Sequence, residues 1–375
     1  MRVASLVLSC SVAVACSSQR APAGTGAPPA PSAGDAAAAA APVAAPLGHA
    51  ADAGAPAPKA ASEPADPSFE ELANVLFADR SNLATVTAAC PPSVPAEARV
   101  RCLFDERYRG DAKAASIAHE LYVKWRVVAG VEVPHTMDGG YRGMIRLEPA
   151  LPIAAERRHL EWIASGLRDV DELFVALERA GSSRRTDAES RPADRPKRYR
   201  WRPITLRFVR SVAARTPSAY AHDWTVAWNL AGSLHTSADA VRETLVHEIF
   251  HLNDYAHPPL GGEAWSLQAL APTFDAIVKK CGTAIRCLGP YSPNDTIVRG
   301  GTYYSFQPGN GVREYAAELA LRYFREQRAV VRGLPKVSAF KCGPPENARA
   351  WELMRDEFWD GIDLVPTCGG GSINR

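Results

Sequence analysis

Residues 236–255 have the sequence TSADAVRETLVHEIFHLNDY, and this stretch decides the fold. Its first four residues resemble a capping box, the pattern that satisfies the free N–H groups at a helix N-terminus. Apolar residues then recur at helical spacing, which predicts one buried face. The residues on that face are Val241, Leu245, Ile249, Leu252 and Ala256. The stretch therefore predicts a capped helix that packs into the core.

The neighbouring face of this helix carries His247 and His251. Side chains four residues apart project together, so the two imidazoles can bind one Zn²⁺ ion. Glu248 reaches a water bound to that ion and acts as general base when the water attacks a peptide carbonyl. The motif predicts a zinc metalloendopeptidase. Asp254 lies on the same face and either orients an imidazole or is simply a polar residue near the helix end.

A catalytic zinc ion has a third protein ligand and keeps its fourth position open. Four residues compete for this role, namely His257, Glu263, Glu314 and Glu318. His257 completes a metzincin-like spacing, but Asp254 stands where that family has the glycine that turns the chain sharply out of the helix. Glu314 and Glu318 lie four residues apart and hence on one face of a second predicted helix. The residues alone leave all four alternatives open.

The motif helix, a loop containing Tyr303 and Tyr304, and the later Glu314-x-x-Ala317-Glu318 resemble the catalytic domain of the anthrax lethal factor family of gluzincins. The resemblance covers residues 204–330. It implies a zincin fold in which Glu314 is the third zinc ligand. It also implies that Tyr303 or Tyr304 stabilises the oxyanion of the tetrahedral intermediate. Glu318 then either supports the site or faces solvent.

Elsewhere in the chain, helical periodicity is more frequent than strand patterns. Helices are predicted over residues 69–79, 114–125 and 154–180, and strands over 204–209 and 224–230, the latter as an edge strand able to pair with an extended peptide. The expected class is α+β, mainly helical and zincin-like, with a small sheet ahead of the motif helix. We expect a helical N-terminal part over residues 68–200 and the catalytic part over residues 201–375.

The N-terminus resembles an export signal. Arg2 precedes an apolar run that ends in Ala13-Val14-Ala15, directly before Cys16. This run is too short to span a bilayer as a permanent helix, so residues 1–15 are predicted to be a cleaved signal with a lipobox before Cys16. Ordinary signal cleavage without lipid is the alternative. Residues 16–67 are mostly Ala, Pro, Gly and Ser, a composition that predicts a disordered tether.

The cysteine count agrees with export. The chain has eight cysteines, and six are left once Cys10 leaves with the signal and Cys16 carries the lipid. These six form three pairs of cysteines that are consecutive in the sequence. This arrangement predicts three disulfide bonds, which oxidising compartments favour. The expected pairs are Cys90 with Cys102, Cys281 with Cys287, and Cys342 with Cys368.

The overall charge indicates no polyanionic partner. The formal net charge is +2, so no strong positive field favours nucleic acid. The expected partner is a peptide or protein substrate, and the expected membrane contact is the lipid anchor at Cys16 alone.

The protein is thus predicted to be exported, either lipid-anchored in a bacterial cell envelope or secreted. Two other functions compete: a zinc hydrolase of another amide, such as a cell-wall crosslink, and a non-enzymatic envelope lipoprotein stabilised by zinc.

Overall fold

A computed structural model of the chain describes residues 66–80, 83–138, 143–184, 199, 203–213, 215, 217–255, 264–298, 301–335 and 338–368. The predicted signal, Cys16 and the tether up to residue 65 lie outside the described residues. Within them, no helix is both long and apolar enough to cross a membrane.

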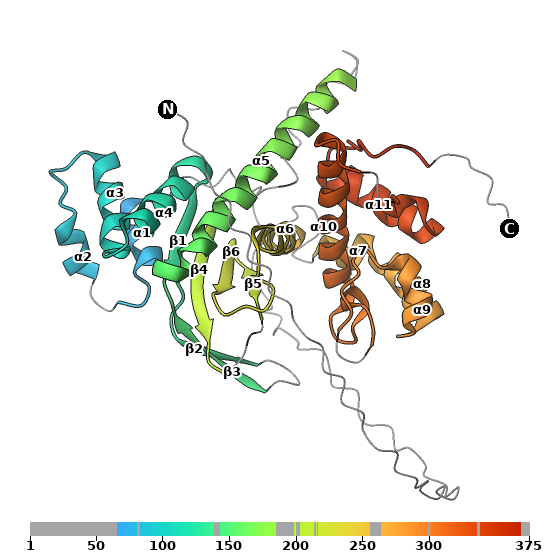
Figure 1. Cartoon of the computed structure of the whole chain (residues 1–375), viewed down its shortest axis with the longest axis horizontal. Helices are drawn as coiled ribbons and strands as arrows, with labels where there is room; N and C mark the ends of the chain where they lie inside the picture. The colour runs from blue at the N-terminus through green and yellow to red at the C-terminus, as the bar shows by residue number, and fades with distance from the viewer. Residues whose placement is uncertain are drawn as a thin grey trace, which may run out of the picture. The chain divides into compact units, whose positions relative to one another are not determined.

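The described residues form a mixed α and β structure, in agreement with the predicted α+β class (Figure 1). The α-helices are α1 (Phe69–Leu76), α2 (Leu83–Ala89), α3 (Ala96–Arg107), α4 (Ala112–Trp125), α5 (Arg158–Arg184), α6 (Ala238–Tyr255), α7 (Trp265–Ala269), α8 (Ala271–Cys281), α9 (Ile285–Leu288), α10 (Gly311–Val331) and α11 (Pro345–Phe358). The strands are β1 (Val127–Val131), β2 (His135–Asp138), β3 (Met144–Pro149), β4 (Ile204–Ser211), β5 (Ala219–His222) and β6 (Thr225–Asn229). Short 3-10 turns include η2 (Ala154–Arg157), η4 (Gly289–Tyr291), η5 (Tyr304–Phe306) and η6 (Phe340–Cys342).

The predicted elements are present at the expected places. The helices expected over 69–79 and 114–125 are α1 and α4, and the one expected over 154–180 is η2 followed by α5. The two expected strands are β4 and β6. The segment 68–200, which was predicted to be helical, also contributes the strands β1, β2 and β3. Its strands belong to the same sheet as those of the later segment.

The sheet is centred on β4, its longest strand. β1 pairs in parallel with the first half of β4, and β3 pairs antiparallel with its end, so both share one edge of β4. β6 pairs in parallel with the other edge, and β5 pairs antiparallel with β6. The order β2-β3-β4-β6-β5 places β6 inside the sheet, so the prediction of an edge strand at 224–230 is wrong. Among the described strands, β5 occupies that edge.

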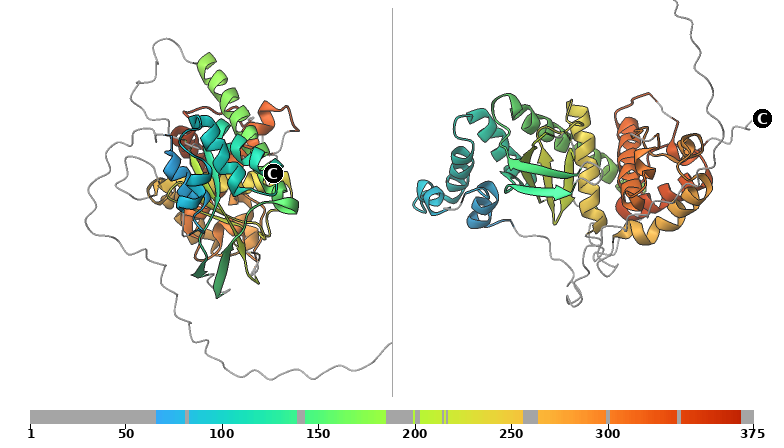
Figure 2. Two further views of the ribbon diagram at one scale, coloured as in Figure 1. Left: turned by 90° about the vertical axis from the view of Figure 1, so that its left-hand side faces the viewer. Right: turned by 90° about the horizontal axis from the view of Figure 1, so that it is seen from below.

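Helix α6 lies between the sheet and the C-terminal helices (Figures 1 and 2). It packs against α5 on one side and α10 on the other. Val241, Leu245, Ile249 and Leu252 are at most 3% exposed, which confirms the predicted apolar face. α5 approaches closely because Gly166 has no side chain: a Cβ there would lie 3.3 Å from the Arg242 Cα. The face of α6 that carries His247 and His251 lies against α10.

The three predicted disulfide bonds are present. Cys90 bonds to Cys102, Cys281 to Cys287 and Cys342 to Cys368, with Cα–Cα distances of 5.7, 5.4 and 5.4 Å. Bonds of this kind persist in oxidising surroundings and are rare in a reducing cytosol. The cysteines therefore indicate an extracytoplasmic location.

Candidate metal centre

The two motif histidines meet on the polar face of α6. Ser237 starts this helix as expected, because its Oγ accepts a hydrogen bond of 3.2 Å from the Ala240 N–H. One turn of helix separates His247 from His251, and their Nε2 atoms lie 3.1 Å apart. His247 is 9% exposed. Helical spacing thus brings two imidazole nitrogens to one point near the surface of the core.

Glu314, from the first turn of α10, completes the cluster. Its Oε2 lies 3.2 Å from His247 Nε2, and its Oε1 lies 3.5 Å from His251 Nε2. The proximity expected between Glu314 and both histidines is therefore confirmed. Among the described residues, these three form the group of His, Cys, Asp or Glu side chains able to hold a metal ion, with ligand atoms within 4.8 Å of one another.

The distances fit a small divalent ion. Atoms that each lie about 2.0–2.1 Å from one ion in a tetrahedral arrangement are about 3.3 Å from one another. The two histidine Nε2 atoms lie 3.1 Å apart, and each lies 3.2 or 3.5 Å from a different oxygen of the Glu314 carboxylate. In addition, Glu314 Oε2 is buried, and its contact at 3.2 Å is with His247 Nε2, the other proposed ligand atom. A buried carboxylate oxygen in that position is suited to a metal ion.

Glu318 contacts His247 on the side of the ring that faces away from the cluster. Its Oε1 lies 3.2 Å from His247 Nδ1, the ring nitrogen that faces away from the cluster. The Asn294 amide donates a hydrogen bond to the other Glu318 oxygen. A carboxylate on the outer nitrogen fixes the tautomer and the ring orientation of a ligating histidine. Glu318 was expected either to support the site or to face solvent. Its contact with His247 agrees with the first role, and its side chain is buried.

The charges of the cluster attract one another, as the pKa shifts of His247 and Glu314 indicate. Burial alone would lower the pKa of His247, but Glu314 and Glu318 outweigh it and raise this pKa well above 6.5. Burial likewise opposes ionisation of Glu314, but hydrogen bonding to His247 and His251 holds its pKa well below 4.5. The carboxylates therefore favour a positive charge at His247. A divalent cation meets the same requirement and leaves both rings neutral.

Glu248 is held next to the cluster and is not part of it. Burial raises its pKa, and the two histidines partly oppose that increase. The residue is 7% exposed and lines a cavity of about 570 Å³ together with His247, Glu318 and Tyr304. A carboxylate with a raised pKa at the wall of a cavity is suited to accepting a proton from a reactant there.

Of the two tyrosines, Tyr304 lies at the site. Its ring centroid is 6.3 Å from that of His247. Burial, together with Glu314 and Glu248, raises the pKa of its hydroxyl above 10, so the hydroxyl stays a hydrogen-bond donor. Tyr303 instead packs over Gly289, where its hydroxyl lies 3.2 Å from the position of an added Cβ. Tyr303 is therefore not placed in the site, because its side chain turns toward η4.

Two further expectations concern the end of α6. Asp254 does not orient an imidazole: its two oxygens accept hydrogen bonds of 2.7 Å from the Ser266 N–H and hydroxyl. These two hydrogen bonds instead connect the end of α6 to the start of α7. His257 and Glu263, the other candidate ligands, lie outside the described residues.

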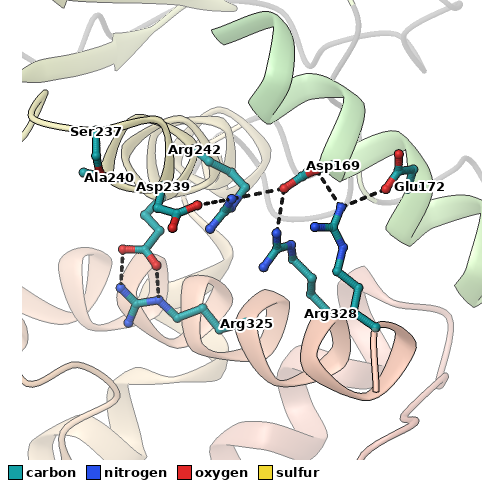
Figure 3. A network of polar contacts seen from close by, with 10 residues as sticks. Asp169, Glu172, Ser237, Asp239, Ala240, Arg242, Arg325 and Arg328 are labelled. Atoms are coloured by element: carbon teal, nitrogen blue, oxygen red, sulfur yellow. Dashed lines mark hydrogen bonds and ion pairs between the residues drawn. The ribbon is translucent and has the colours of Figure 1, made fainter. Parts of the chain in front are cut away.

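An ion-pair network fixes α6 to α5 and α10 (Figure 3). Asp169 on α5 accepts hydrogen bonds from Arg242 of α6 at 3.1 Å and from Arg328 of α10 at 2.9 Å. Glu243 of α6 binds Arg325 of α10 through two hydrogen bonds of 2.8 and 2.6 Å. These pairs connect α6 and α10, the two helices that carry the metal-binding cluster, directly and through α5.

Comparison with known proteins assigns the chain to no family. No protein-family model matches it, and neither a curated protein nor a solved structure shows significant similarity to it. The function proposed below therefore rests on the geometry of the site.

Sequence reasoning missed some residues of the site. Asn294, which holds Glu318, lies in an irregular loop with no periodic signal. Leu234 and Arg325 line the cavity but resemble an ordinary surface leucine and helix arginine in the sequence. The spacing of four residues between Glu314 and Glu318 was the one available signal for a paired role.

Proposed function

We propose that the protein is a zinc-dependent metallopeptidase of gluzincin type that hydrolyses peptide bonds. The observation that carries the proposal is the convergence of His247, His251 and Glu314, at distances suited to one small ion, beside a buried Glu248 on an open cavity. Two histidines and a glutamate form the ligand set of several zinc peptidases. The four-residue spacing on α6 and the glutamate on α10 support a zincin-like fold.

Each residue has a defined role in the proposed reaction. Zinc, when bound, supplies Lewis-acid polarisation of the peptide carbonyl and lowers the pKa of water. Glu248 accepts the proton of the attacking water and passes it to the leaving amine. The neutral Tyr304 hydroxyl donates a hydrogen bond to the oxyanion that develops at the carbonyl oxygen. Glu318 keeps His247 in the orientation that binding requires.

The rival functions differ in ligand number and substrate. A structural zinc site is closed by four protein ligands and needs no general base. The described residues bring three ligand side chains together, next to a buried carboxylate on a cavity, and this favours catalysis. A hydrolase of another amide, such as a cell-wall crosslink, would use the same chemistry, so substrates must distinguish the two.

The setting of the enzyme is also a proposal. The three disulfide bonds support an exported protein. Cleavage before Cys16, lipid attachment to its thiol and a tether over residues 16–67 would place the enzyme at a membrane surface. Mass spectrometry of the mature N-terminus from a bacterial host tests this, because an unmodified Cys16 would favour simple secretion.

The proposed function is tested by zinc analysis and a peptide-library cleavage assay on the wild type and on Glu248→Gln. The variant should bind one zinc ion per chain and lose about 10²- to 10⁴-fold in kcat. Glu314→Ala should lose zinc and activity together, whereas Glu120→Gln on α4 should change neither. Zinc held by four protein ligands, or full activity in Glu248→Gln, would refute the proposal. Cleavage of cell-wall crosslinks but of no linear peptide would favour the other amide hydrolase.

A further inference from the structure

A second cavity lies beside the C-terminal half of α10, and its lining includes no residue of the metal-binding cluster. Its volume of about 520 Å³ falls within the range of small-ligand pockets. Its lining is mostly apolar and includes both cysteines of the Cys342–Cys368 disulfide bond. The cavity therefore gives a small molecule a route to this bond.

The Cys342–Cys368 bond is more exposed than the other two disulfide bonds. Both of its cysteines are exposed, whereas Cys90 and Cys281 are 0% and 7% exposed. Each of the other two bonds thus has one sulfur in a buried residue. Thiol–disulfide exchange begins when a thiolate reaches a disulfide sulfur, so access selects the bond that reacts. Of the three bonds, Cys342–Cys368 is the one that a dissolved thiol reaches most easily.

The two sides of this bond are held differently. Cys342 lies in η6, where its N–H donates to the Ala339 carbonyl at 3.0 Å. Residues 366–368, by contrast, make no hydrogen bond with any other described residue. The Val365 carbonyl, directly before this segment, accepts from Lys341 Nζ at 2.7 Å. Opening of the disulfide bond therefore releases residues 366–368 and leaves the preceding chain in place.

The charged groups that line the cavity favour an anionic reactant. Arg322 and Arg325 line it, and the Nη1 atom of each makes no hydrogen bond within the described part of the chain. The acid among the described lining residues, Glu326, is only 8% exposed and accepts a hydrogen bond from Arg322. Arginine donors bind carboxylates well, and local positive charge raises the concentration of anions near the bond.

We propose that Cys368 is a site of reversible modification by a low-molecular-weight thiol that carries a carboxylate. The reactant loses its thiol proton to solvent, and its thiolate forms a new S–S bond with Cys368 Sγ. The Cys342–Cys368 bond breaks, and its electron pair goes to Cys342 Sγ, which leaves as a thiolate. Cys368 is the modified partner because residues 366–368 can move to make room for the added group. Cys342 stays in η6, where its return attack restores the original bond and releases the thiol.

The test incubates the full chain with a mixture of reduced and oxidised glutathione, a thiol with two carboxylates. The reaction is stopped with acid at early times, and mixed disulfides are located by mass spectrometry of peptides. Cys368 should carry glutathione before any other cysteine, and Cys342 should be recovered as the free thiol. The other two disulfide bonds should react at least about 10-fold more slowly, because each has one sulfur in a buried residue.

A second reactant tests the charge requirement. Glutathione diethyl ester has the thiol without the carboxylates, so it should modify Cys368 at least about threefold more slowly per thiolate at low salt. Arg322→Gln should remove this difference, whereas the matched control Arg286→Gln, on α9 next to Cys287, should retain it. Modification of Cys342 instead, equal rates for the three disulfide bonds, or equal rates for the acid and the ester on the wild type overturns the proposal. None of these measurements depends on peptidase activity, so the proposed function is tested separately.

Discussion

His235 should make the protein sensitive to mild acid. Its ring is 6% exposed, stacks on Trp228, and donates from Nδ1 to the Asn229 carbonyl at 2.9 Å. Its Nε2 is buried without a partner among the described residues. Burial lowers the pKa of His235 from 6.5 to about 3, and the nearby His159 adds to this effect, so the folded protein keeps the ring neutral.

The size of the effect follows from linkage. Because the folded pKa is depressed, the unfolded chain binds a proton near pH 6.5 that the folded chain refuses until about pH 3. The contribution to stability is fully present above pH 6.5 and is lost as the pH falls through the window between these values. Each unit costs about 1.4 kcal/mol, so lowering the pH from 7.5 to 5 should remove about 2 kcal/mol through His235.

The assay is urea unfolding of the wild type and of His235→Asn at several pH values between 7.5 and 5, at one fixed zinc concentration. Asn retains a donor toward the Asn229 carbonyl but does not titrate. The variant should be less stable at pH 7.5 because the ring stacking is lost. Its free energy of unfolding should then fall with acid by about 2 kcal/mol less than that of the wild type. The metal site contributes equally to both proteins, so the difference reports the titration of His235 together with its coupling to the neighbouring His159 ring. Parallel pH profiles, or an NMR titration of His235 near pH 6.5, would refute the reasoning.

Three further predictions concern the site and its frame. Glu318→Gln should weaken zinc binding about 10- to 100-fold, measured by competition with a chelator, because His247 loses its orienting carboxylate; unchanged affinity would contradict that role. Asp169→Asn should lower the free energy of unfolding by about 3 kcal/mol, since it leaves several arginines without their shared carboxylate, whereas Glu172→Gln should cost under about 0.5 kcal/mol; equal effects of the two would argue against the network. Gly130→Ala should destabilise the protein by about 2 kcal/mol or more in urea unfolding, because its Cβ would lie 2.2 Å from a backbone oxygen of α1, and a neutral effect would show that β1 can shift.

The motif helix and its partners were accessible from the sequence for physical reasons. The spacing of His247 and His251 is a local property of a helix, and the apolar face of α6 is periodic. The spacing on one helix could not identify Glu314, because Glu314 is distant from the histidines in the chain. The resemblance to gluzincins selected it from four candidates. The disulfide pairing was simple because each cysteine bonds to its neighbour in the sequence.

Other features were hidden because they depend on tertiary packing. β1 is the run VVAGV, buried at every position, and such a run has no alternation to distinguish a strand from a helix end. β6 reads as a strand, but its place inside the sheet depends on the later pairing of β5 along its outer edge. The choice between Tyr303 and Tyr304 depends on the direction of two adjacent side chains in an irregular loop, which no periodic pattern fixes.

The disulfide bonds also bear on how the chain is made. They join cysteines 12, 6 and 26 residues apart, and every bond links consecutive cysteines of the described chain. Short loops close quickly and at a low cost in entropy. Each pair is complete before the next pair follows it in the sequence, so a chain that enters an oxidising compartment from its N-terminus can form the correct bonds in order. Oxidative maturation of this protein should therefore need little disulfide reshuffling.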